Sequence, residues 1–159
     1  MSTQAIGAAA AGTLVIGGGG TLAAYAAGAF NGESTYDSFQ AYFDAKLSET
    51  YTYTGNHSDL KNKMKVNLTG SDKETYKSEL KKIISKEVVG ESVLDTDVDG
   101  AESDDTKLGK VYGKAKTWCE ATKAVKLTPT QNKKWNEANV QSHEDWAPFM
   151  TVCLEKKPS

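Results

Sequence analysis

The chain has 159 residues and a net charge of −2, from 19 basic and 21 acidic side chains. This length is typical of one domain with room for a short additional segment. Every basic side chain counted in that charge is Lys, and none is Arg. Because Arg is the residue that most often makes bidentate contacts with phosphates and base edges, this composition argues against a nucleic-acid partner.

The first 32 residues are rich in Ala and Gly and contain no Asp, Glu, Lys or Arg. Two interpretations of this segment compete. The spacing Gly18-x-Gly20-x-x-Ala23 fits the phosphate-binding turn of a dinucleotide fold. That fold also requires Val- and Ile-rich parallel strands, which the remaining sequence does not supply. We therefore favour the second interpretation, a membrane-targeting helix over residues 5–30.

As a helix, residues 5–30 would extend about 39 Å, which is longer than the hydrocarbon core of a bilayer, about 30 Å. The same segment contains two Ala-x-Ala patterns, at residues 24–26 and 27–29, which fit signal-peptide cleavage. We expect residues 1–32 to form a transmembrane or signal-anchor segment that places residues 33–159 outside the cell. Cleavage of the segment would instead give a secreted protein.

Residues 33–159 predict a mainly α-helical domain of about four to five short amphipathic helices with little or no sheet. Ser34 is expected to cap a helix whose apolar residues continue at helical spacing to Leu47. The sequence Ser71–Glu74 is a capping box, and Gly90 is expected to end the helix that follows it. Between these helices, the alternating run 51–54 predicts an extended segment.

The C-terminal half predicts three more helices. One runs from about Lys107 to Ala124, with an apolar face that includes both a Trp and a Cys. Another begins at Thr128, with Trp135 and Ala138 as its inward-facing residues. The last covers residues 142–155, where Pro148 must either begin the helix or kink it.

The sequence KTWCEAT at residues 116–122 occurs together with an uncharged Ala/Gly-rich N-terminus, Lys-rich helices without Arg, and a second Cys near the C-terminus. This combination resembles the paralogous hypothetical surface proteins of haemotrophic mycoplasmas. The resemblance spans the whole length and implies a surface-exposed or secreted product that serves antigenic variation. It implies no enzymatic activity and supplies no catalytic residues to carry over.

Cys119 and Cys153 are the only two cysteines. In an oxidising exterior they would form a disulfide, stabilising the fold by about 3–4 kcal/mol on the chain-entropy model. Two buried free thiols are the other interpretation that the sequence leaves open. A catalytic Cys paired with His57 or His143 has no support from the local sequence, and these four side chains lack the spacing of a metal site.

The segment Asp95-Thr-Asp97-Val-Asp99-Gly100 places oxygen ligands at alternate positions before a turn glycine, as a calcium loop requires. The later positions depart from that pattern, although Asp104 could supply a further ligand. A solvated acidic connection between two helices is the alternative interpretation. If Ca²⁺ binds at all, we expect weak affinity in the millimolar class.

Together these patterns favour a non-enzymatic protein that is anchored in the cell membrane through residues 5–30 and displays a helical domain as an interaction or antigenic surface. Its expected partner is a host or cell-surface protein. The alternative is a secreted Ca²⁺-dependent binding module that uses the acidic segment 95–105.

Overall fold

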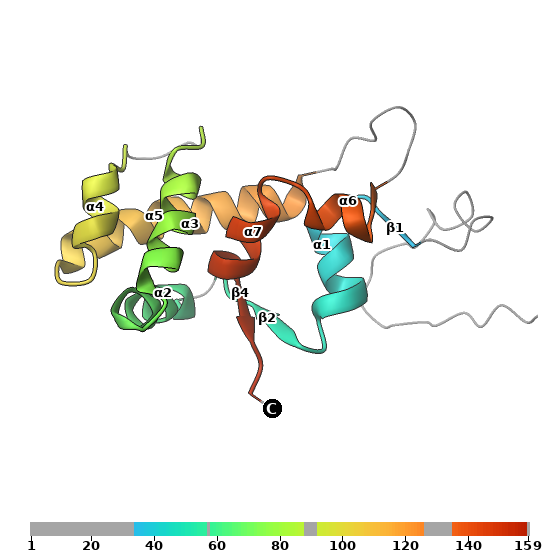
Figure 1. Ribbon diagram of the computed structural model, residues 1–159, viewed down its shortest axis with the longest axis horizontal. Coiled ribbons are helices and arrows are strands. Elements are labelled where there is room, and N and C mark those ends of the chain that lie inside the picture. Colours follow the sequence, from blue (N-terminus) through green and yellow to red (C-terminus); the bar gives the residue numbers. More distant parts are fainter. Residues whose placement is uncertain (1–33, 57, 88–91, 126–134, 159) are drawn as a thin grey trace, which may run out of the picture.

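The computed structural model of the protein describes residues 34–56, 58–87, 92–125 and 135–158, whose arrangement is shown in Figure 1. The predicted membrane-targeting segment and the helix start predicted at Thr128 lie outside these ranges. The helices in chain order are α1 (Phe39–Tyr42), η2 (Phe43–Leu47), α2 (Asp59–Thr69), α3 (Lys73–Ile84), α4 (Asp95–Gly100), α5 (Asp105–Ala124), α6 (Glu137–Gln141), α7 (Trp146–Pro148) and η3 (Phe149–Cys153), of which η2 and η3 are π-helical. The strands are β1 (Thr35–Tyr36), β2 (Tyr51–Tyr53), β3 (Trp135–Asn136) and β4 (Leu154–Lys156).

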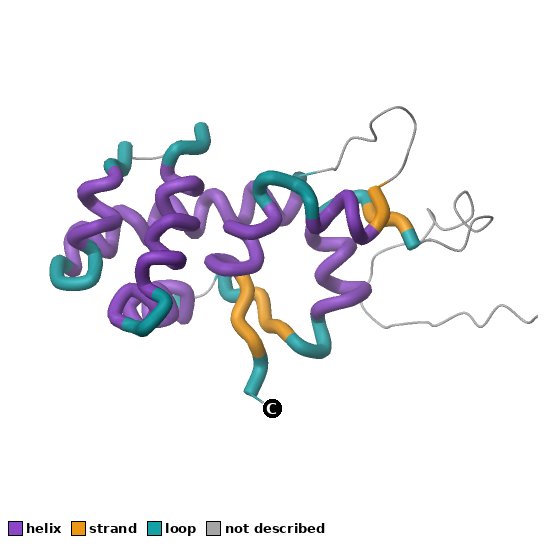
Figure 2. Tube along the Cα trace, viewed as in Figure 1, coloured by secondary structure: helices purple, strands orange, loops and turns teal. Residues whose placement is uncertain are grey.

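In the described ranges far more residues are in helices than in strands (Figure 2). The strands form two antiparallel pairs, β1 with β3 and β2 with β4. The prediction of a mainly helical domain with little sheet is therefore confirmed, although the helices are shorter and more numerous than the sequence suggested. No helix within the described ranges combines the length and the hydrophobicity that crossing a membrane requires.

The longest helix, α5, runs through the middle of the molecule (Figure 1). Its N-terminal half contacts α2, α3 and α4. Helices α1 and η3 also pack against α5. Asp104 caps the helix by accepting the backbone N–H groups of Thr106 (2.8 Å) and Lys107 (3.2 Å). The predicted helix from Lys107 to Ala124 is confirmed, and it begins two residues earlier because of this cap. Its buried side chains are Leu108, Val111, Ala115, Trp118, Cys119 and Thr122.

Two helices, α2 and α3, pack against the N-terminal half of α5. Helix α3 was predicted, and its apolar stripe is buried as expected from Tyr76 to Ile84. Two details of the prediction are wrong, because the helix begins at Lys73 without a side-chain cap, so that no capping box forms, and it ends at Ile84 rather than at Gly90. Helix α2 was not predicted. Only three apolar side chains, Leu60, Met64 and Leu68, mark its buried face, and they are separated by lysines and asparagines.

The N-terminal segment differs from the prediction in where its helix begins. Thr35 and Tyr36 are in strand β1, and the capping residue is Ser38, whose hydroxyl accepts the backbone N–H of Ala41 (3.1 Å). The prediction that Ser34 caps the helix is therefore wrong, because residues 35–36 pair with β3 instead. The helical spacing of the apolar residues nevertheless holds, since Phe39 and Tyr42 are buried.

The C-terminal segment is a chain of short elements. Pro148 is the third residue of α7, in the first turn, where the backbone N–H that Pro lacks has no intrahelical partner to lose. The helix therefore begins just before this residue, and η3 and β4 follow directly. Trp135 is in strand β3 and Ala138 is exposed, so the prediction that Ala138 faces inward is wrong.

Candidate functional site

Cys119 and Cys153 form a disulfide that joins the middle of the fold to its C-terminal segment. Their Cα atoms are 5.7 Å apart, and both side chains are fully buried. The predicted disulfide is therefore present, and the alternative of two free thiols is excluded. Because the bridge connects α5 to the last residue of η3, it holds β4 next to the central helix.

The backbone on both sides of Cys153 is held by hydrogen bonds from two other elements. Thr54 donates both its backbone N–H (2.9 Å) and its hydroxyl (3.2 Å) to the carbonyl of Cys153. Lys63 donates its ammonium group to the carbonyls of Val152 (3.0 Å) and Leu154. Three consecutive carbonyls are thus bound by Thr54, which directly follows β2, and by Lys63 of α2.

A glycine is required where this segment passes the disulfide. A Cβ atom added to Gly55 would lie 2.6 Å from the Cβ of Cys119, far inside van der Waals contact. Gly55 therefore allows the backbone to approach the disulfide closely. This close approach also covers the disulfide from one side.

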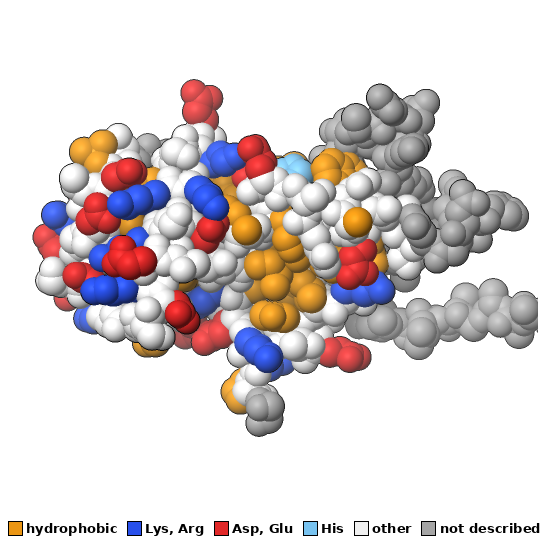
Figure 3. Space-filling model, in the orientation of Figure 1, with side chains coloured by type: hydrophobic (Ala, Val, Ile, Leu, Met, Phe, Trp, Pro, Cys, Tyr) orange, Lys and Arg blue, Asp and Glu red, His pale blue; other side chains and the backbone are white. Residues whose placement is uncertain are grey.

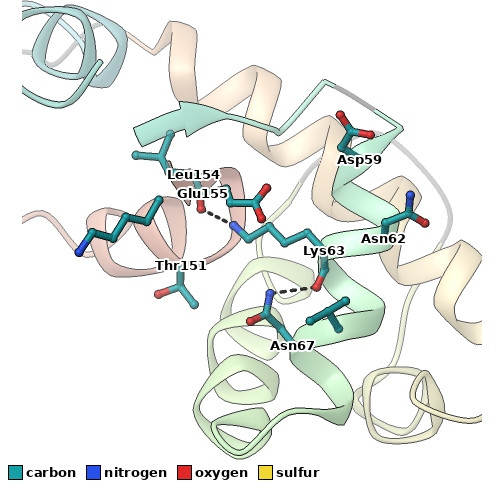
Figure 4. Close-up of a pocket in the computed structure, with 9 residues that line it drawn as sticks. Asp59, Asn62, Lys63, Asn67, Thr151, Leu154 and Glu155 are labelled. Carbon is teal, nitrogen blue, oxygen red and sulfur yellow. Dashed lines mark hydrogen bonds between the residues drawn. The ribbon is translucent and has the colours of Figure 1, made fainter. Parts of the chain in front are cut away.

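Lys63 extends from α2 toward the carbonyl of Leu154 (Figure 4). Its burial lowers the pKa of the Lys63 ammonium group to about 8, and the nearby carboxylate of Glu155 opposes this shift. The two carbonyl acceptors explain how a lysine is accommodated at this half-buried position, because polar groups removed from water require hydrogen-bond partners. Sequence analysis did not identify Lys63, since α2 itself was not predicted.

Lys63 lies within a groove between α2 and the C-terminal segment (Figure 4). The groove has a volume of about 540 Å³. The residues of α2 that line it are Asp59, Asn62, Lys63, Val66 and Asn67. The C-terminal segment contributes Thr151, Leu154, Glu155 and Lys156. With 69% of its surface exposed, Val66 is the most exposed large hydrophobic residue of the described ranges.

The aromatic side chains near the disulfide form a packed cluster. Phe149 is fully buried and lies 5.3 Å from Phe39 between ring centroids. Trp146 is 8% exposed and contacts both Phe39 (5.4 Å) and Tyr42 (5.1 Å) edge to face. Trp146 is therefore a core residue, and its ring packs edge to face against its aromatic neighbours.

Tyr53 links strand β2 to α5. Its hydroxyl donates to the carboxylate of Glu120 (2.7 Å), and the ammonium of Lys123 lies 4.2 Å from its ring centroid. Burial, followed by the hydrogen bond to Glu120, raises the pKa of the Tyr53 hydroxyl well above its usual range. The hydroxyl therefore remains protonated and acts as a structural donor.

The acidic segment predicted as a calcium loop is helix α4. Asp97 accepts the backbone N–H of Leu94 (2.9 Å), and Asp99 forms an ion pair with Lys81 of α3 (2.7 Å). Asp104 caps α5, and Asp95 is exposed at the start of α4. The connection is helical rather than a loop because the segment caps itself and its charge is compensated by Lys.

Metal binding is equally unsupported elsewhere in the part of the chain that the structure describes, because no three His, Cys, Asp or Glu side chains there gather as metal ligands would. Calcium binding at the acidic segment stays a prediction. Thermal unfolding measured with and without millimolar Ca²⁺ would test it.

Basic and acidic side chains alternate over the surface of α3 and α4, at the left of Figure 3. Glu102 contacts both Lys73 (3.4 Å) and Lys77 (3.3 Å), and Lys86 contacts Glu144 (2.9 Å). Hydrogen bonds lower the pKa of the Glu102 carboxyl below its usual range, and the bond from Lys77 contributes more than the bond from Lys73. Mixed charges of this kind give a solvated face without a strong field of one sign.

Of the residues considered for catalysis, those that the structure describes have structural roles. Both cysteines are bonded to each other and cannot act as nucleophilic thiols. His143 accepts the backbone N–H of Asp145 through Nδ1 (3.1 Å), and its ring contacts Phe39. His57 lies outside the described ranges.

In comparisons with known proteins, neither a family model, nor a curated protein, nor a solved structure matches the chain significantly.

Proposed function

We propose that the chain is a non-enzymatic surface protein whose residues 33–159 form a disulfide-stabilised domain outside the cell, delivered to the membrane by residues 1–32. In this proposal residues 5–30 anchor the protein in the bilayer, or target it for secretion if they are cleaved. The displayed domain serves as an interaction or antigenic surface for a host or cell-surface protein.

The observation that carries the proposal is the buried disulfide between Cys119 and Cys153. Disulfides persist in oxidising compartments and are rare in the reducing cytosol. The fold is built around this bridge, since Lys63 and Thr54 bind the backbone on both sides of Cys153. The charge-free N-terminal segment offers a route to such a compartment.

The non-enzymatic part of the proposal is supported by the roles of the chemically reactive side chains. The two cysteines form the bridge, Asp97 and Asp104 cap helices, and Lys63 binds backbone carbonyls. The resemblance to surface proteins of haemotrophic mycoplasmas points to the same role, with sequence variation on a constant scaffold. The acidic segment offers no observation that would favour the calcium-dependent module over this proposal.

Protease treatment of intact cells tests the proposal. We expect an added protease to remove residues 33–159 from whole cells while a cytosolic control protein stays intact. Mass spectrometry of the native N-terminus then separates the two forms, because an intact Met1 indicates an anchor and a start at Ala27 or Phe30 indicates cleavage. Full protection from the protease, with recovery in the soluble cytosolic fraction, would contradict the proposal.

A further inference from the structure

The disulfide between Cys119 and Cys153 has no surface that a thiol in solution could reach. Both cysteines are fully buried, and the helices that carry them, α5 and η3, pack against each other in the core. A third element also packs on the bridge. It consists of residues 54–56, which directly follow β2 and belong to neither a helix nor a strand. We call these residues the strap.

The backbone of the strap packs directly on Cys119. A Cβ atom added to Gly55 would lie 2.6 Å from the Cβ of Cys119, so no further atom fits between the two residues. The same added atom would lie 2.6 Å from Cζ of Tyr53, whose ring therefore flanks the strap. Gly55 is itself buried, whereas the next residue, Asn56, is exposed. The strap thus separates Cys119 from solvent at this position.

Hydrogen bonds attach the strap to the other cysteine of the bridge. Thr54 donates its backbone N–H (2.9 Å) and its hydroxyl (3.2 Å) to the carbonyl of Cys153. Because Thr54 is only 3% exposed, these two bonds are shielded from water. The strap therefore contacts Cys119 through Gly55 and Cys153 through Thr54.

The residue before the strap is held by regular structure. Tyr53 pairs with Leu154 in the antiparallel ladder, and its hydroxyl donates to Glu120 of α5 (2.7 Å). The strap follows this fixed point as an irregular segment. Such segments open locally at a lower free energy than the whole domain needs to unfold. The strap can therefore lift at Thr54 while β2 and α5 stay folded.

We propose that the strap shields the Cys119–Cys153 bridge from external thiols, so that opening of the strap, rather than unfolding of the whole domain, sets the rate at which the bridge is reduced. The inference goes beyond the proposed surface role, because it concerns the folded domain in any compartment.

Reduction by a dithiol shows which step the strap blocks. A thiolate of the reductant attacks one sulfur of the bridge, forms a mixed disulfide with that cysteine and releases the other cysteine as a thiolate. The second thiolate of the reductant then displaces the first cysteine. The products are a cyclic disulfide of the reductant and two protein thiolates, which take up protons. The closed strap prevents the first attack.

The rate of reduction by dithiothreitol tests the proposal on the full chain, purified in mild detergent without denaturant. Samples are quenched over time in denaturant with an alkylating reagent, and the reduced fraction is measured by mass spectrometry. Thr54→Val keeps the side-chain shape but removes the hydroxyl donor, and it should accelerate reduction about fivefold. Thr52→Val, at an exposed position of β2, should change the rate less than twofold.

A second pair of variants displaces the strap instead of loosening it. Gly55→Ala forces the strap away from Cys119 and should accelerate reduction at least tenfold. Gly109→Ala adds the same methyl group to α5 where no atom lies within 4 Å, and it should change the rate less than twofold. If Gly55→Ala does not fold, the Thr54 and Thr52 variants still decide the question.

Global unfolding is the competing route to the bridge. Val98→Ala removes buried volume from α4, and urea unfolding measures how far it lowers the stability of the domain. We expect this variant to be reduced within twofold of the original rate. Acceleration by the same factor as its unfolding equilibrium constant would overturn the proposal, as would a rate that Thr54→Val leaves unchanged. Because purified protein is used, either outcome leaves the test of surface display in cells unaffected.

Discussion

Around the N-terminal half of α5 the buried side chains are mostly aliphatic, whereas around its C-terminal half they are mostly aromatic. The aliphatic end consists of α2, α3 and α4, whose core residues include Leu60, Leu80 and Val98. The aromatic end consists of α1, α6, α7 and η3, whose core residues include Phe39 and Phe149. Ion pairs cover the aliphatic end, and the disulfide lies in the aromatic end.

The two ends differ because their helices differ in length. Helices α2 and α3 have 11 and 12 residues, so each buries an apolar stripe over three turns. Helices α6 and α7 have 5 and 3 residues, too few to be stable without tertiary contacts. The segment near the C-terminus is therefore stabilised by packed aromatic side chains and by the disulfide rather than by long helices. Four predictions test this comparison.

The largest effect is expected at Phe149, at the centre of the aromatic cluster. Phe149→Ala should lower the free energy of unfolding by about 3–5 kcal/mol, because it leaves a cavity between Phe39 and Trp146. Urea unfolding measures this loss. Phe149→Leu keeps most of the buried volume and should lose less than half as much. A smaller loss for Phe149→Ala than for Leu80→Ala, in the aliphatic end, would break the comparison.

The disulfide is expected to contribute nearly as much. Replacing both cysteines by Ala should lower the free energy of unfolding by about 3–4 kcal/mol, because the bridge closes a loop with a sequence separation of 34 residues. Limited proteolysis of this variant should cut first between α6 and β4. Initial cleavage within α2 or α3 would instead show that the bridge stabilises the aliphatic end.

A smaller effect is expected from pH, through Lys63. Its pKa is about 8 in the folded protein and about 10.4 in an unfolded chain, so between these values the unfolded state binds more protons. The contribution of Lys63 to stability should therefore rise with pH over this window, by about 2 kcal/mol between pH 8 and pH 10. From about pH 9 upward the raised pKa values of Tyr53 and Tyr76 act in the opposite direction, because the unfolded tyrosines lose protons first.

Urea unfolding at pH 7, 8, 9 and 10 measures this dependence. Lys63→Met should remove the rise, whereas Lys65→Met, at an exposed position of the same helix, should keep it. A rise that persists in Lys63→Met would assign the titration to another group.

The smallest effect is expected from the ion pairs of the aliphatic end. Lys81→Met removes the contact with Asp99 (2.7 Å), but water already screens this exposed pair. The urea midpoint should stay within experimental error of the unmodified protein, and 0.5 M NaCl should have equally little effect. A loss as large as that of the disulfide variant would show that charges, rather than aliphatic packing, stabilise this end.

The sequence predicted the elements whose apolar stripes are long. Helix α5 and most of α3 follow from periodicity, and the extended residues 51–53 follow from alternation. Helix α2 did not, because its three apolar residues are diluted by lysines and asparagines. The acidic segment 95–100 matched a loop pattern, yet it forms a helix. Asp97 caps it locally by accepting the backbone N–H of Leu94, and Lys81 of α3 pairs with Asp99, a contact that depends on the fold.

The candidate site was predictable only in its cysteines. Which carbonyls of β4 face Lys63 depends on which residues of β2 and β4 exchange hydrogen bonds, and this register is fixed by tertiary packing. In the sequence nothing distinguishes Lys63 from a surface lysine, and only the fold places its ammonium beside the carbonyls of η3 and β4. The glycine at position 55 is likewise explained only by its closeness to Cys119.

The redox state of Cys119 and Cys153 in the native cells is the measurement on which the surface-domain account depends. Cells are lysed in a denaturant that already contains one alkylating reagent, so that buried free thiols react as well. After this reagent is removed, the protein is reduced and treated with a second, heavier reagent, and the peptides are weighed by mass spectrometry. We expect both cysteines to carry only the second reagent, since the bridge is formed where the protein resides. Labelling of both thiols by the first reagent in unreduced protein would show a reducing location and contradict the account.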